Sequence, residues 1–347
     1  MIDTFEGYSQ LSLFTAMAIY AAAFVLYSID LATRSGQARG ASAGGEQQRA
    51  GAGAAAAGLS RQSAGGSADS ARGSVATLVR PPAAPAGGGS VPLVRRSKVL
   101  RVAFSLTVLG WLFQLAATIL RGIDAQRVPF GNMYEFALTA TTVIVGVFVV
   151  VQIFVDVRFV GALITGLALL FLGITRTNFY VPVRPLPPAL DSYWLVLHIL
   201  VAVLAVGLLT LAFGLAVAQL LQTRRESRLA AGLQAGPAFL ATFPPAERLE
   251  NLAYRVNIIG FIFWSFTLIA GAIWAEHAWG RYWGWDTKEV WTFIIWVLYA
   301  GYIHARATRG WRGTRASWLA IIAYAAVLFN FAIVNIFFKG LHAYSGL

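Results

Sequence analysis

Long apolar segments recur along the whole chain, and they constrain its fold more strongly than any other feature. A membrane-spanning helix needs about 20 predominantly apolar residues. The sequence offers such segments at about residues 8–31, 99–121, 131–154, 159–177, 193–221, 252–275, 291–309 and 315–338. Hydrophobic residues make up 58% of the chain and charged residues 12%, which is typical of membrane proteins. We therefore expect an all-α, polytopic integral membrane protein with about eight transmembrane helices.

Basic residues are distributed unevenly among the loops that connect these segments. The first, third, fifth and seventh loops carry most of the arginines, whereas the other loops and both ends of the chain carry few. The positive-inside rule then puts the basic loops in the cytoplasm and both termini outside, in the cell membrane of a bacterium. Topology accounts for the net charge of +12, so no nucleic-acid partner is expected.

Composition divides the chain into three parts. Residues 1–33 are predicted to form an N-terminal transmembrane helix, and residues 99–347 a transmembrane domain with an outward-facing tryptophan-rich loop. Between them, residues 34–98 are a low-complexity Ala/Gly/Ser/Arg tract that cannot bury a core. This tract is predicted to be a disordered cytoplasmic linker whose charge attracts membrane lipid. The chain has no cysteine, which excludes disulfides and thiolate metal sites.

The tryptophan-rich loop is the densest chemical signal in the sequence. It reads Trp279-Gly-Arg-Tyr-Trp-Gly-Trp-Asp286 and lies between two apolar segments, so it is expected at a membrane surface. One interpretation is an interfacial belt, in which tryptophans anchor helices at the lipid headgroups. Belt residues usually come singly or in pairs, however. Trp279, Trp283 and Trp285 are dense enough to form an aromatic platform for a large flat ligand.

Asp286 has a structural interpretation beside the ligand-binding one. It precedes the next apolar segment, and Glu289 follows three residues later. This spacing resembles a capping box, in which Asp starts the helix and Glu closes the first turn. The cap would fix the directions of Trp283 and Trp285, and contact between Asp286 and a ligand remains compatible with it.

The chain has four histidines, three of which are candidate iron ligands. His198 near the start of one apolar segment and His342 beyond the last one approach the tryptophan loop from the same side of the membrane. His304 lies about 20 Å deeper by the helical rise. Such histidines can simply bond neighbouring helices. Two imidazoles beside an aromatic platform nevertheless suit six-coordinate haem, whereas zinc requires three or four close ligands. We assign His277 to the loop.

At this point the residues resemble a known family. The tryptophan loop followed by Lys288-Glu-Val-Trp291 is similar to the motif of the haem-handling superfamily, and more closely to the CcsA/ResC family of System II cytochrome c biogenesis, often named CcsB in actinobacteria. Supporting stretches are residues 131–136, 192–198, 299–306 and 340–344. The resemblance spans about residues 100–347. Thr287 departs from it, since the family commonly has proline there.

The resemblance implies roles for individual residues. His198 and His342 look like two external axial ligands of haem b, with Trp279, Trp283, Trp285 and Asp286 around it. His304 looks like an iron ligand of a transmembrane haem site. Its second ligand is expected on a CcsB/ResB-type membrane partner.

The resemblance also implies a function. The protein is expected to carry haem to the outer face and to present it to an apocytochrome c with a Cys-x-x-Cys-His motif, as part of a cytochrome c synthase (haem lyase) complex. Because the chain has no cysteine, other proteins must keep the apocytochrome thiols reduced. Two alternatives remain: an intramembrane proton or solute transporter that uses His304 and Asn330, and a passive scaffold that recruits a partner.

Overall fold

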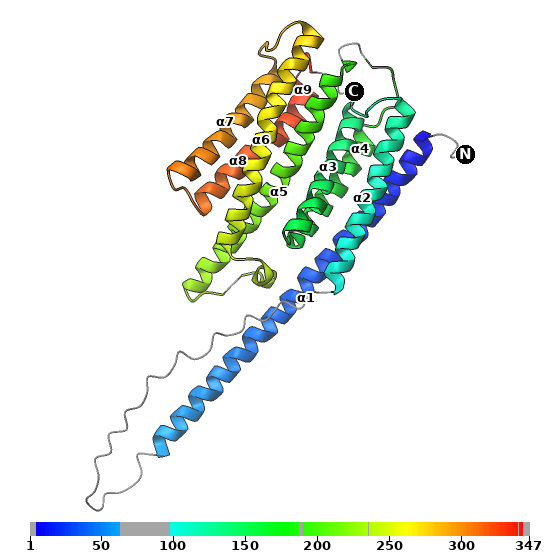
Figure 1. Ribbon diagram of the computed structural model, residues 1–347. Coiled ribbons are helices and arrows are strands. Elements are labelled where there is room, and N and C mark those ends of the chain that lie inside the picture. The colour runs from blue at the N-terminus through cyan, green and yellow to red at the C-terminus, as the bar shows by residue number, and fades with distance from the viewer. Residues whose placement is uncertain (1–4, 63–97, 187–189, 235, 339, 343–347) are drawn as a thin grey trace, which may run out of the picture.

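The computed structural model describes residues 5–62, 98–186, 190–234, 236–338 and 340–342, with side chains omitted for residues 37–62. These ranges contain helices and loops but no strand. The long helices are α1 (Phe5–Gln62), α2 (Lys98–Ala125), α3 (Met133–Phe154), α4 (Gly161–Asn178), α5 (Tyr193–Ala230), α6 (Ala246–Trp279), α7 (Thr287–Thr308) and α8 (Thr314–Phe329) (Figure 1). Short helical turns are η1 (Arg158–Val160), η3 (Ala238–Thr242), the π-helical η4 (Asn330–Val334) and α9 (Asn335–Phe337).

Seven of the described helical segments are long and apolar enough to cross a membrane. They are Phe5–Gly36, Lys98–Ala125, Met133–Phe154, Arg158–Asn178, Tyr193–Ala230, Ala246–Trp279 and Thr314–Phe337. The eighth predicted span corresponds to α7, a helix of 22 residues that packs against α6 and α8. Its first turn carries Lys288 and Glu289 and its last turn Arg306, which lowers its mean hydropathy. The prediction of an all-α, multi-pass membrane protein is confirmed.

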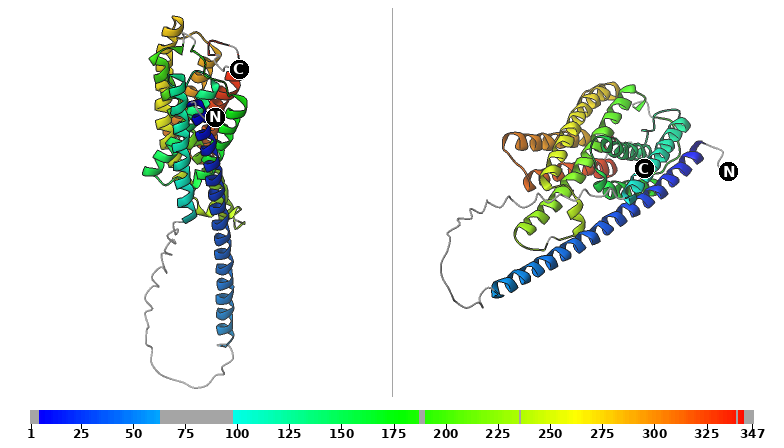
Figure 2. Two further views of the ribbon diagram at one scale, coloured as in Figure 1. Left: turned by 90° about the vertical axis from the view of Figure 1, so that its right-hand side faces the viewer. Right: turned by 60° about the horizontal axis from the view of Figure 1, so that its bottom comes forward.

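Two groups of helices meet at α5. One hydrophobic cluster joins α1, α2, α3 and α4 with α5 and the first half of α6, and a second joins α5, α6, α7 and α8. The most extensive helix–helix packing is that of α5 against α6 and of α1 against α2. The helices of each pair lie side by side in Figures 1 and 2. A third cluster, which includes Phe130, Leu195 and Trp274, lies where α3, α5 and α6 meet the connecting loops. We call this end of the bundle, which also carries residues 280–286, the loop end.

The helix α1 is longer than the sequence led us to expect. It continues to Gln62 and extends beyond the other helices at the end opposite the loop end (Figure 1). Residues 34–62 are therefore helical in the structure, in contrast to the predicted disordered linker. The physical reason is their content of alanine, the residue with the highest intrinsic helix propensity. Residues 63–97 lie outside the described residues, and for them the linker stays a prediction.

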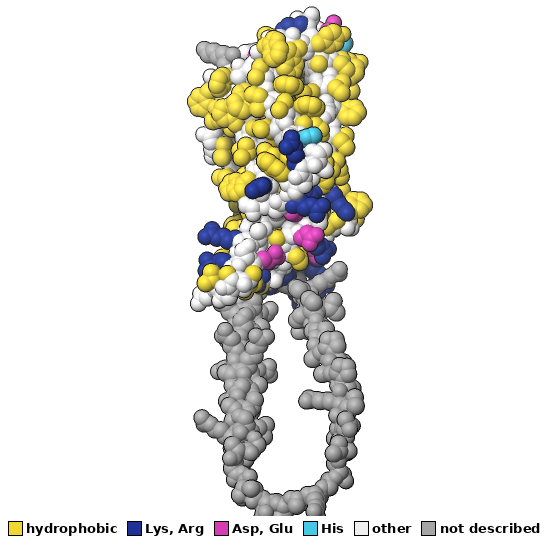
Figure 3. All heavy atoms as spheres, turned by 90° about the vertical axis from the view of Figure 1, so that its left-hand side faces the viewer, with side chains coloured by type: hydrophobic (Ala, Val, Ile, Leu, Met, Phe, Trp, Pro, Cys, Tyr) yellow, Lys and Arg dark blue, Asp and Glu magenta, His cyan; other side chains and the backbone are white. Residues whose placement is uncertain are grey.

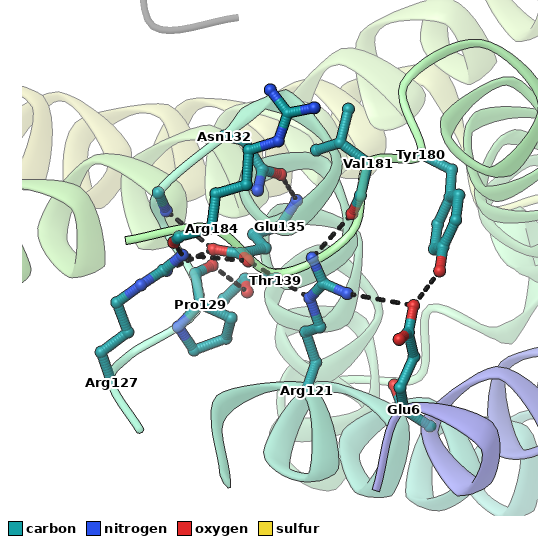
Figure 4. A network of polar contacts seen from close by, with 12 residues as sticks. Glu6, Arg121, Arg127, Pro129, Asn132, Glu135, Thr139, Tyr180, Val181 and Arg184 are labelled. Atoms are coloured by element: carbon teal, nitrogen blue, oxygen red, sulfur yellow. Dashed lines mark hydrogen bonds and ion pairs between the residues drawn. The ribbon is translucent and has the colours of Figure 1, made fainter. Parts of the chain in front are cut away.

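A buried ion-pair network fixes the connection between α2 and α3 at the loop end (Figure 4). The carboxylate of Glu135 accepts hydrogen bonds from Arg121 Nε at 3.2 Å, from Arg127, and from the backbone N–H of Gly131 at 2.9 Å. Arg121 and Glu135 are both fully buried. Glu135 thereby holds the turn that begins α3, where the Asn132 side chain accepts the N–H of Glu135 as the N-cap.

Glu289 holds the loop before α7 in the same manner. Its carboxylate accepts hydrogen bonds from Arg281 Nη1 at 3.2 Å and from the backbone N–H groups of Gly284 at 2.8 Å and Asp286 at 3.0 Å. Like Glu135, it is the third residue of its helix and pairs with an arginine eight positions earlier. The starts of α3 and α7 are thus held in the same way, by a glutamate at the third helical position that pairs with an arginine. Both helix starts flank a cavity at the loop end.

Candidate functional site

A largely apolar cavity of about 190 Å³ lies at the loop end of the bundle. Its walls come from α3, α5, α6, the tryptophan loop, the start of α7 and the η4–α9 region. His198 and His342, which are 144 positions apart in the sequence, both line it, together with Trp274, Trp283 and Lys288. The structure therefore brings the two predicted external histidines together on one cavity.

His198 is held by a backbone carbonyl of the neighbouring helix. Its Nδ1 lies 3.0 Å from the carbonyl oxygen of Thr267 on α6. Because a carbonyl oxygen can only accept, Nδ1 carries the proton and Nε2 keeps its lone pair. The His198 ring stacks on Trp274, with ring centroids 5.9 Å apart and planes 14° apart. At Gly271 a Cβ atom would come within 2.8 Å of the imidazole, so only glycine leaves room for this ring.

His342 is held by a carboxylate. Its Nδ1 lies 2.8 Å from Asp286 Oδ2, and the backbone N–H of Leu341 donates to Asp286 Oδ1 at 3.1 Å. The hydrogen bond from His342 holds the pKa of the Asp286 carboxyl below its usual range, so the carboxylate is ionised at neutral pH. As in His198, Nδ1 is the donor and Nε2 keeps its lone pair. Any Cβ atom at Gly340 would collide with Asp286.

The capping box predicted at Asp286 is present. Its carboxylate accepts the backbone N–H of Lys288, and the side chain of Glu289 accepts the backbone N–H of Asp286. Asp286 therefore begins α7 and orients His342 at the same time. The structural and the site-related interpretation of this residue hold together, because Oδ2 accepts hydrogen bonds both from the backbone N–H of Lys288 and from His342 Nδ1, while Oδ1 accepts the N–H of Leu341.

The tryptophans surround the two imidazoles without forming one flat platform. Trp279 makes an edge contact with His342 at 4.9 Å between centroids, and Trp274 makes one at 5.5 Å. Trp283 lines the cavity and lies nearly perpendicular to Trp285, with centroids 5.8 Å apart. Trp285 is 73% exposed and has a positive φ of 59°. The rings thus form an apolar surround in which the ring planes point in different directions.

Two of the four histidines lie away from this cavity. His304 is exposed on α7, four residues before the helix ends, with Nε2 at 3.2 Å from Thr308 Oγ1. It does not line the cavity, in agreement with its predicted separation from His198. His277 lies in the last turn of α6 rather than in the loop, where its Nδ1 contacts the carbonyl of Ile273.

Sequence reasoning did not assign Trp274, Lys288 or Asn330 to the haem site. Trp274 contacts both imidazoles, Lys288 is the lysine among the described residues that line the cavity, and Asn330 lines the cavity from the start of η4. The only signal for Trp274 was its position one helical turn or so before Trp279, and Lys288 was visible only as part of the family motif. Asn330 was assigned to a transporter alternative with His304, but of these two only Asn330 lines the cavity.

The donor set suits a ligand that needs two axial nitrogens. Among the described residues, no group of three or more His, Cys, Asp or Glu side chains could hold a metal ion by itself. Two imidazoles with free Nε2 atoms and an apolar, aromatic surround instead fit the iron and the ring of a haem. Ligand pockets usually measure about 300–1,000 Å³, so a porphyrin must extend beyond this cavity or displace side chains that line it.

Comparison with known proteins agrees with the fold and with the motifs. The sequence model of the family "Cytochrome C assembly protein" matches residues 99–342. The chain is 32% identical over 308 residues to the cytochrome c biogenesis protein CcsA of Synechococcus sp. (strain JA-3-3Ab), covering 74% of this chain and 89% of that protein. It is 30% identical over 262 residues to CcsA of Guillardia theta, covering 72% of this chain and 87% of that protein.

A solved structure shares the fold at low sequence identity. The cytochrome c haem lyase CcmF superposes with a TM-score of 0.58 at 15% identity, and the match covers 94% of this chain and 46% of CcmF. The fold and the family match together define a multi-pass membrane protein of cytochrome c assembly. Within that class, the chain belongs to the CcsA family of cytochrome c biogenesis proteins.

Proposed function

We propose that this protein binds haem at the loop end, with His198 and His342 as the two axial ligands, and presents it for covalent attachment to apocytochrome c. The observation that carries the proposal is that both imidazoles line one cavity, each with Nδ1 bonded to an acceptor and Nε2 left for a metal. The names of the relatives, cytochrome c biogenesis protein and haem lyase, agree with this chemistry.

The side chains of the cavity then act on haem as the substrate. The Asp286 carboxylate makes His342 a stronger donor and holds its orientation, and the Thr267 carbonyl does the same for His198. The tryptophan rings supply apolar contact and limit access of water to the iron. Haem b is the form expected, because its vinyl groups are unreacted and thioether formation requires them.

The covalent step joins haem to the apocytochrome. Each thiol of a Cys-x-x-Cys-His motif adds across one vinyl double bond, forming a C–S bond while the proton goes to the other vinyl carbon. This addition requires proximity of thiol and vinyl rather than a nucleophile from this chain. The chain contains no cysteine, so thiol-reducing proteins are needed to keep the apocytochrome ready.

We further propose that the loop end faces the extracytoplasmic side of a bacterial cell membrane. Lys and Arg side chains gather near the opposite end of the bundle, next to the residues drawn in grey, and apolar side chains cover much of the remaining surface (Figure 3). Basic loops stay on the cytoplasmic side. A reporter enzyme fused beyond residue 342 tests this placement, because it should be active only outside the cytoplasm.

An absorption spectrum of the purified protein tests the haem proposal directly. The expected result is a Soret band with the sharp visible bands of low-spin, six-coordinate haem, because two imidazoles give a strong axial field. A proton or solute transporter would purify without these bands. A protein that shows no Soret band, even after reconstitution with haem and its partner membrane protein, would contradict the proposal.

His304 is proposed to bind haem at a second site within the membrane, together with a histidine of a CcsB/ResB-type partner. The imidazole is exposed on α7 near the end opposite the loop end, so it is accessible to another chain. A low-spin iron there needs a second axial group, and the other three histidines of the chain lie at the loop end, His198 and His342 on the cavity and His277 in the last turn of α6.

We expect His304→Ala to lower the haem content of the loop-end site at least about tenfold when the protein is purified with its partner, because haem is proposed to reach that site from the His304 site, and loss of an axial ligand should weaken binding there by more than about 1.4 kcal/mol. Added imidazole should restore little, because the site lies within the membrane. Thr308→Val is the matched control, since it removes only the hydroxyl that contacts His304. If His304→Ala bound as much haem as the parental protein, the inner site would be excluded and His304 would have a role in helix packing only.

Residues 34–98 are predicted to be dispensable for the chemistry. Deleting residues 40–90 keeps the basic residues beside both membrane helices, so topology and cytochrome c maturation should stay within about twofold of the parental level. Haem staining of mature c-type cytochromes measures this. A deletion that also removes Arg95 and Arg96 serves as the topology control. Loss of maturation despite correct insertion would reveal a specific partner site in the segment.

A further inference from the structure

The cavity lining includes polar side chains that the proposed axial ligation does not use. Lys288 at the start of α7 lines the cavity, and its Nζ donates to the side-chain oxygen of Asn335 on α9. Asn330 and Asn335 line the same cavity. A cation on the wall of a mostly apolar cavity needs an anion for full compensation, because a neutral amide oxygen satisfies only part of its charge.

The nearby carboxylates are already engaged. Asp286 accepts hydrogen bonds from His342 and from the backbone N–H of Leu341, and Glu289 accepts those of Arg281 and Gly284. Among the described residues, the ion pairs formed by these two carboxylates are with His342 and Arg281, not with Lys288. Lys288 therefore has no carboxylate partner among the described residues and can pair with an anionic group of a ligand in the cavity.

Asn330 supplies a second and independent observation. It is 5% exposed, lines the cavity, and its Oδ1 makes no hydrogen bond to any described residue. It begins the π-helical turn η4, a distortion that is common at functional sites. Oxygen and nitrogen of an amide are interchangeable by a flip, so Asn330 can offer either a donor or an acceptor to a ligand.

We propose that Lys288, with the amides of Asn330 and Asn335, binds a carboxylate of the ligand, and that this carboxylate is a haem propionate. The assignment rests on the proposed function, since it takes haem as the ligand. Two axial histidines leave the porphyrin free to rotate about the axis through the iron. A propionate bound at Lys288 stops that rotation, so the vinyl groups keep one direction for the incoming thiols. Lys288 is thus a positioning residue.

The test compares haem with haem dimethyl ester, in which both propionates are uncharged. The full chain in detergent is titrated with each porphyrin, and the Soret change gives the dissociation constant. The protein should prefer haem over the ester at least about tenfold, the value of one charge-assisted hydrogen bond. Lys288→Met should lose that preference while retaining low-spin bands and its affinity for the ester, and Lys288→Arg should keep most of it.

Lys98→Met is the matched control, because Lys98 is exposed at the other end of α2. Each variant is compared with itself for the two porphyrins, so a general loss of folding lowers both affinities and cannot mimic the expected result. Equal binding of haem and ester by the parental protein, or equal losses for both in Lys288→Met, would overturn the Lys288 assignment alone. Failure of the parental protein to bind either porphyrin would overturn the proposed function as well.

Discussion

Alanine at both His198 and His342 is expected to abolish the low-spin haem spectrum of the purified protein and to reduce mature c-type cytochromes at least about tenfold, because both axial nitrogens of the proposed site are lost. Each single variant should retain weakened, five-coordinate haem, since one imidazole stays on the cavity wall. The measurement combines absorption spectra of the purified variants with haem staining of cytochromes from the same cells.

Added imidazole separates ligation from folding in this experiment. In each single variant, free imidazole should enter the vacant axial position and restore the low-spin bands and part of the maturation. His277→Ala is the matched control, because His277 is exposed at the end of α6 and does not line the cavity. Normal cytochrome levels in the double variant would rule out these two histidines as the essential ligands.

Glu135→Leu is expected to destabilise the protein by about 3–5 kcal/mol, although Glu135 does not touch the cavity. The substitution leaves Arg121 buried without its main carboxylate partner and frees the turn held by Arg127 and Gly131. Arg121 would keep its hydrogen bond to the Val181 carbonyl at 2.8 Å, which favours the lower part of that range. The change in unfolding free energy is measured by denaturant titration in detergent.

A matched variant decides whether burial causes this loss. Glu247 lies exposed in the first turn of α6, so Glu247→Leu removes the same charge without leaving a buried partner, and should cost no more than about 0.5–1 kcal/mol. Glu135→Gln should fall between the two, because its amide keeps one acceptor oxygen. Similar losses for Glu135→Leu and Glu247→Leu would show that the network is energetically unimportant.

The motifs in the sequence predicted the two histidines of the proposed site and Asp286, but they did not predict the other side chains that line the cavity. His198 and His342 were predicted together from their shared side of the membrane, and Asp286 from its spacing to Glu289. Trp274 lies against both imidazoles, yet it reads in the sequence as one more aromatic residue of an apolar helix. Lys288 reads as part of a first helical turn, because its contact with Asn335 joins segments 47 positions apart.

The length of α1 is a second feature that the sequence pattern did not predict. Low complexity and the absence of core-forming residues indicate disorder for residues 34–98. The helix nevertheless runs to Gln62, because an alanine-rich chain that follows a membrane helix needs no new nucleus to extend it.

The sequence by itself determined that this is an all-α, multi-pass membrane protein of the CcsA family, because apolarity over about 20 residues and short motifs are local properties of a chain. It also predicted the capping box, since a cap depends on residues three positions apart. Only the tertiary structure decided that His198 and His342 share one cavity, that both donate through Nδ1, and that Lys288 lines the same cavity. Those facts depend on contacts among α5, α6, α7 and the residues after α9, which no local pattern encodes.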